Sequence, residues 1–65
     1  MDGSEQEVLD IITILESLSM RPTWRMVYRR FPGDDFQLRE TLASLIKQGK
    51  ITESIVDENT VYHSI

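Results

Sequence analysis

Apolar residues in the first third of the chain recur with the spacing of a helix. They fall within one stripe at about 100° per residue, as on a helix that covers a core. The stripe consists of Val8, Ile11, Ile12, Leu15 and Leu18. Ser4 and Glu7 have the spacing of a capping box, so we expect a helix over residues 4–19. Leu9 and Ile14 lie outside the stripe, which indicates that a second side of this helix is also covered.

A second helix is predicted after a break at Met20–Pro22. Pro22 disfavours helical geometry in the residue before it, and Thr23 can then cap the new helix. The apolar positions that follow are spaced i, i+3, i+4 and i+7, so they share one face. They are Trp24, Val27, Tyr28 and Phe31. We expect these rings in the core, and the alternative is a stacking platform for single-stranded nucleic acid.

The third predicted helix begins at a cap on Asp34 or Asp35 and runs to about Gln48. Gly49 follows it as the left-handed residue that commonly closes a helix. The stripe that faces the core consists of Leu38, Leu42, Leu45 and Ile46. This helix would therefore pack through leucines and leave a polar face open.

The end of the chain has the period of strands. Residues 51–56 and 60–65 are rich in β-branched residues and flank a polar turn at 57–59, which predicts a β-hairpin. Three helices followed by a hairpin give an α+β fold. This order, over about residues 5–65, resembles the winged helix-turn-helix fold, and its most specific stretch is Leu38–Ile51.

The resemblance implies one winged helix-turn-helix domain over residues 1–65, with a short strand at Met20–Pro22 joining the hairpin wing. It does not extend to the subfamily that binds left-handed Z-DNA. The helix positions that carry Asn and Tyr in that subfamily are Arg39 and Ala43 here, and the wing lacks its Pro and Trp. Winged helices bind DNA, RNA and proteins alike, so the fold leaves the function open.

Composition argues against catalysis. The chain has 65 residues, no Cys and one His, which excludes disulfides and a thiol nucleophile. So short a chain has little room for a core and a substrate cleft together. We therefore expect no enzyme activity, no cofactor, no metal site and no small-molecule substrate. His63 and the acidic pairs lie at strand and turn positions without a catalytic arrangement.

The net charge is −4, but the charges are unevenly distributed. Both ends of the chain are acidic, and a basic block lies between them. The block consists of Arg21, Arg25, Arg29 and Arg30. Arginines on the second helix of a helix-turn-helix suit the phosphate backbone. The alternative is that they pair with the acidic first helix of the same molecule or of a partner. Met26, opposite the apolar face, is a candidate exposed contact.

The third helix would be the recognition helix. Its candidate nucleic-acid contacts are Gln37, Arg39, Ser44 and Lys47. Gln can read adenine, Arg can read guanine, and Ser can meet base edges or phosphate. The alternative is an ordinary solvated face, because Asp34, Asp35 and Glu40 oppose contact with DNA.

These observations favour a small DNA-binding transcription regulator. A homodimer on two half-sites of double-stranded DNA would compensate for the small footprint, with Leu9 and Ile14 as candidate dimer contacts. The alternative is a winged-helix module that binds a partner protein, or whose acidic faces mimic DNA. The acidic start of the chain and its interrupted apolar stretch indicate neither a targeting signal nor a membrane span. We expect a cytoplasmic protein, or a nuclear one in a eukaryote.

Overall fold

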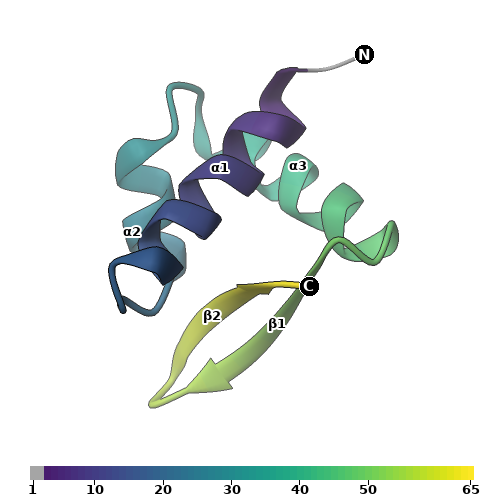
Figure 1. Cartoon of the computed structure of the whole chain (residues 1–65). Helices are drawn as coiled ribbons and strands as arrows, with labels where there is room; N and C mark the ends of the chain where they lie inside the picture. The colour runs from purple at the N-terminus through teal and green to yellow at the C-terminus, as the bar shows by residue number, and fades with distance from the viewer. Residues whose placement is uncertain (1–2) are drawn as a thin grey trace.

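The computed structural model describes residues 3–65 and confirms the predicted fold class (Figure 1). Its elements are α1 (Gly3–Ser17), α2 (Trp24–Arg30), α3 (Asp35–Lys47), β1 (Ile51–Val56) and β2 (Asn59–Ser64). Three helices followed by a two-stranded antiparallel hairpin are consistent with a winged helix-turn-helix layout. Residues 1 and 2 of the predicted domain lie outside the described residues. No helix within residues 3–65 has the length and apolar character needed to cross a membrane.

The core lies between the three helices and the base of the hairpin. Its fully buried side chains include Val8, Ile12, Leu15, Val27, Leu38 and Leu45. In Figure 1, α1 crosses α2 and α3, and the hairpin extends away from the helices. β2 packs against α1 and α2, whereas β1 packs against α3. The helices therefore leave one side of α2, one side of α3 and most of the hairpin open to solvent.

The first helix differs from its prediction at both ends. It begins at Gly3, so Ser4 lies inside the first turn rather than at the cap. It ends at Ser17, because Ser19 adopts a left-handed φ of 60° and the Met20 amide donates to the Leu15 carbonyl at 3.0 Å. Leu18 thus leaves the helix and is 60% exposed, so its predicted place in the core is wrong.

The second and third helices begin where their caps predict. Thr23 Oγ1 accepts from the Met26 amide at 3.3 Å, and Asp34 Oδ1 accepts from the Gln37 amide at 2.8 Å. Gly49 closes α3 with a φ of 76°, as predicted. These caps fix the short α2 and the longer α3 on either side of the turn at residues 31–34.

The extended segment before α2 joins the hairpin, but slightly later in the chain than the resemblance implies. The Tyr62 amide donates to the Pro22 carbonyl at 2.8 Å, and Thr23 forms an isolated antiparallel bridge with Val61. The pairing is therefore one contact point at Pro22 and Thr23, not a strand over Met20–Pro22. It holds the start of α2 against β2.

The hairpin runs in register from Ile51 opposite Ser64 to Val56 opposite Asn59. The two residues between the strands, Asp57 and Glu58, have left-handed φ angles of 51° and 67°. This is the pattern of a type I′ turn, which matches the twist of the strands but favours Gly over residues with a Cβ. The tip of the wing is therefore strained.

Replacing Glu58 with Gly should stabilise the fold by about 0.5–1 kcal/mol, because the left-handed cost exceeds the added flexibility of Gly. Denaturant unfolding measures the change. Glu58→Gln, which removes the charge but keeps the Cβ, is the control. Equal midpoints for the two variants would mean that charge, not backbone strain, limits the turn.

Candidate nucleic-acid interface

The arginines of the basic block are all exposed. Among residues 3–65, no carboxylate oxygen lies within 4.0 Å of a guanidinium nitrogen of these arginines. The contact of this kind that is found in residues 3–65 joins His63 and Glu16. The alternative that they pair with the first helix of the same molecule is therefore wrong for the described part of the chain. An external anion can reach each of these guanidinium groups.

The geometry of α2 brings two of these arginines together. Val27 is fully buried and Phe31 is 7% exposed, so the opposite side of α2 faces solvent. Arg25 and Arg29 lie there, one helical turn apart. Like charges at this spacing destabilise a helix by about 0.2–0.5 kcal/mol, which an anion bound between them would relieve.

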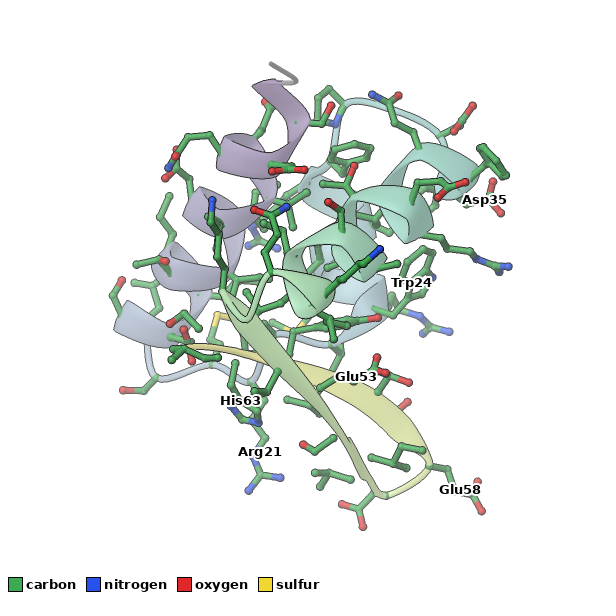
Figure 2. All side chains as sticks on the ribbon, turned by 90° about the vertical axis from the view of Figure 1, so that its right-hand side faces the viewer. Arg21, Trp24, Asp35, Glu53, Glu58 and His63 are labelled. Carbon is green, nitrogen blue, oxygen red and sulfur yellow. The ribbon has the colours of Figure 1, made fainter. Side chains whose placement is uncertain are left out.

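The other two arginines of the block lie at the edges of α2. Arg30 is the last residue of the helix, and Arg21 precedes it. In Figure 2, Arg21 lies on the side of His63, away from Trp24. The block is thus a pair on the helix with one further arginine at each end, rather than one uniform patch.

The aromatic residues of α2 do not all enter the core. Trp24 and Tyr28 stack with ring centroids 5.8 Å apart and an interplanar angle of 7°. The guanidinium carbon of Arg39 lies 5.6 Å from the Trp24 ring centroid, a cation–π contact between α3 and α2. Tyr28 is 42% exposed, so its predicted place in the core is wrong, whereas Phe31 is confirmed.

Met26 is also placed differently from its prediction. It is partly buried and packs against the core, so it is not an exposed contact. The physical reason is that helical spacing takes no account of the other elements. The core cluster, which includes side chains of α1, α3 and the hairpin, reaches Met26 although this side chain points away from Val27.

The predicted contacts on α3 are divided between two faces. Gln37 Nε2 donates to Ser4 Oγ and Ser44 Oγ donates to Glu5 Oε2, both at 2.9 Å. These two side chains therefore face α1. Arg39 and Lys47 lie on the exposed side of the helix.

The outer face of α3 is defined here as the exposed residues that point away from its leucine stripe and do not bond to α1 or begin the helix. They are Phe36, Arg39, Glu40, Ala43 and Lys47. Phe36, which is 67% exposed, is the residue that sequence reasoning missed. Its position opposite the leucine stripe of the same helix is the signal that identifies it.

A cleft of about 360 Å³ separates the outer face of α3 from the hairpin. Trp24, Arg39, Ala43, Glu53 and Tyr62 are among its lining residues. In Figure 2, Asp35 lies above Trp24, and Glu53 and Glu58 follow along the hairpin below it. The cleft thus holds one arginine, Arg39, and one carboxylate, Glu53, and this carboxylate and Glu58 at the tip restrict how closely a phosphate backbone can approach the wing.

Burial raises the pKa of the Tyr62 phenol above its ordinary 10.0, Glu53 raises it further, and Arg39 lowers it. The folded state thus favours the neutral phenol. Stability should be unaffected below about pH 10 and should fall as pH rises from there through the higher pKa of the folded state. Denaturant unfolding between about pH 9 and 11 measures the fall, which Tyr62→Phe should reduce.

His63 belongs to a polar array that ties β2 to α1. Its Nδ1 lies 4.0 Å from Glu16 Oε2, and its Nε2 lies 3.4 Å from Ser54 Oγ. Glu16 also accepts from the hydroxyl of Ser64. The imidazole is 48% exposed, and the part of the chain that the structure describes holds no group of three residues able to bind a metal. The array therefore acts as a surface link between helix and wing.

The two candidate dimer contacts on α1 do not lie together. Leu9 is partly buried against the core, whereas Ile14 is 54% exposed. Leu18 and Met20, which are 60% and 40% exposed, follow Ile14 along the chain. Any apolar contact through α1 would therefore involve its C-terminal end.

Comparison of the chain with known protein families, with curated proteins and with solved structures gives no match in any of the three. Inferences about function therefore rest on the fold and on the side chains described above.

Proposed function

We propose that this chain is a small DNA-binding transcription regulator of the winged-helix type. The observation that carries the proposal is the set of four exposed arginines on and beside α2, which have no ion pair among residues 3–65. Arginine is always charged and can donate two hydrogen bonds to one phosphate, so it suits the DNA backbone. In a helix-turn-helix the helix that precedes the recognition helix, here α2, crosses that backbone.

The outer face of α3 would then lie toward the major groove of double-stranded DNA. Arg39 is the candidate for guanine, and Lys47 is the candidate for a phosphate. Gln37 and Ser44 could reach bases only by exchanging their hydrogen bonds to α1. Asp35 and Glu40 oppose the approach of DNA, and added salt screens this repulsion as well as the attraction of the arginines.

A homodimer remains part of the proposal. One domain of this size covers a short site, and a second copy would double the number of contacts on two half-sites. The exposed C-terminal end of α1, with Ile14 and Leu18, is the candidate surface.

The test is a titration of labelled duplex at about 50 and 200 mM salt. Four phosphate contacts predict a log–log salt slope of roughly −3 to −4, at about −0.9 for each phosphate. Absence of binding at about 50 mM salt, where electrostatic binding is strong, would overturn the proposal.

A second candidate function is favoured by apolar side chains on the surfaces that DNA would have to meet. Phe36 is 67% exposed beside Asp35, and Ile55 is 77% exposed on the acidic hairpin. On this alternative the domain binds a partner protein, and α2 contacts an acidic surface of that partner. In a related form of this alternative, the acidic faces of the domain mimic DNA and bind a protein at its nucleic-acid site. Recovery of a stoichiometric partner that survives nuclease and is lost in Phe36→Ala would favour it.

A further inference from the structure

The Trp24–Tyr28 stack ends in an exposed ring. Trp24 is partly buried and has two ring contacts, one with Tyr28 and one with the guanidinium of Arg39. Tyr28 is 42% exposed, and within residues 3–65 Trp24 is the one ring partner it has. Further planar groups can therefore stack on Tyr28, whose orientation is already fixed by Trp24.

The charges around Tyr28 select what can stack there. Arg25 lies one helical turn before it and Arg29 follows it directly; both are exposed and lack an acidic partner in the described chain. A nucleotide offers the matching pair of groups, because a flat base and an anionic phosphate are joined in one unit. Proteins that hold single strands combine these same two contacts, an aromatic ring for the base and a cation for the backbone.

The bases of a continuous duplex cannot stack on this ring. Its bases are stacked and paired inside the helix, and an α2 that crosses its backbone meets only sugar and phosphate. An exposed tyrosine beside backbone-binding arginines gains a stacking contact only where a base is unpaired. The stack and its two arginines therefore distinguish single-stranded DNA from duplex.

We infer that Tyr28 stacks on an unpaired base while Arg25 and Arg29 hold the adjoining phosphates, so that DNA with a single-stranded segment is bound more tightly than continuous duplex. This inference rests on the proposed function, since it names the form of DNA that the α2 surface takes. Trp24 acts as the positioning residue that holds the tyrosine ring.

The experiment compares a labelled duplex with the same duplex interrupted by a gap of about six nucleotides, a length typical of single-strand sites. Fluorescence anisotropy gives both affinities in one buffer. Stacking of one base should make the gapped DNA bind about 5- to 150-fold more tightly than the duplex. Tyr28→Phe keeps the ring and should keep this preference. Tyr28→Leu keeps an apolar contact with Trp24 but removes the ring, and should abolish the preference without weakening duplex binding.

A spectroscopic readout separates stacking from a change in fold. Trp24 is the single tryptophan of the chain, so combining Trp24→Phe with Tyr28→Trp moves the fluorescent indole to the exposed end of the stack. Gapped DNA should quench its emission and continuous duplex should leave it nearly unchanged. Circular dichroism of each variant shows whether it has folded.

The outcomes distinguish the inference from the proposed function. Equal affinity for gapped and continuous DNA, or a preference that survives Tyr28→Leu, would overturn the inference and leave duplex binding in place. If neither DNA binds and a poly-glutamate peptide does, both fail, and the arginines of α2 serve a protein partner.

Discussion

Replacing Arg25 and Arg29 together with alanine should weaken binding to all DNA sequences alike and flatten the log–log salt slope by about 2. The loss follows from the removal of the two phosphate contacts proposed above, each of which would release about one counterion. Base preference should not change, because phosphate contacts carry no direct sequence information. Anisotropy titrations at several salt concentrations on two unrelated duplexes measure the affinity, the slope and the preference together.

The fold should tolerate this change. Both side chains are exposed and without an acidic partner in residues 3–65, and substitutions at such positions usually fall within about ±0.5 kcal/mol. Thermal unfolding checks this. Arg25→Lys/Arg29→Lys is the matched control, since it keeps both charges and should keep most of the slope. If the alanine variant binds with the wild-type slope, the phosphates lie on another face.

The features that the sequence predicted correctly are those that depend on neighbouring residues in the chain. The caps at Thr23 and Asp34 and the closing Gly49 depend on residues within one turn, and all three are found. The exposure of Arg25 and Arg29 also followed from their spacing against Val27 and needed no knowledge of the rest of the fold.

What the sequence could not predict depends on contacts between distant segments. Ser44 faces α1 because Glu5, 39 residues earlier in the chain, lies beside it in the folded molecule. Tyr28 is exposed, and its stacking partner Trp24 contacts Arg39 of α3, which follows eleven or more residues later in the chain. The candidate site was therefore predicted in its charges, whereas its aromatic component appeared in the sequence only as the alternative to a place in the core.

The end of α1 shows a different failure. The periodic stripe runs through Leu18 without interruption, so hydrophobic spacing alone extends the helix to it. Ser19 stops the helix in a left-handed conformation that Gly usually adopts, and Ser gives no such signal in the sequence. As a result, Leu15 and Leu18 occupy the same stripe in the sequence, but Leu15 is buried and Leu18 is exposed.

That pair gives the largest expected change in stability. Leu15 is fully buried and Leu18 is 60% exposed. Leu15→Ala should cost about 2–5 kcal/mol, because it leaves a cavity between α1 and the rest of the core. A domain of this length is stable by only about 3–10 kcal/mol, so the variant should be substantially unfolded at room temperature or unfold at much lower denaturant.

Leu18→Ala is the matched control, with the same chemical change three residues away. It should shift stability by no more than about 0.5 kcal/mol, because its side chain is already largely in water. Urea unfolding followed by Trp24 fluorescence compares the two variants with the wild type. Equal losses would mean that α1 continues past Ser17 and buries both leucines, and the left-handed end at Ser19 would then be wrong. Unequal losses in the expected order would place the end of the core at Leu15, and would leave Leu18 beside Ile14 as apolar surface available to a second copy of the chain.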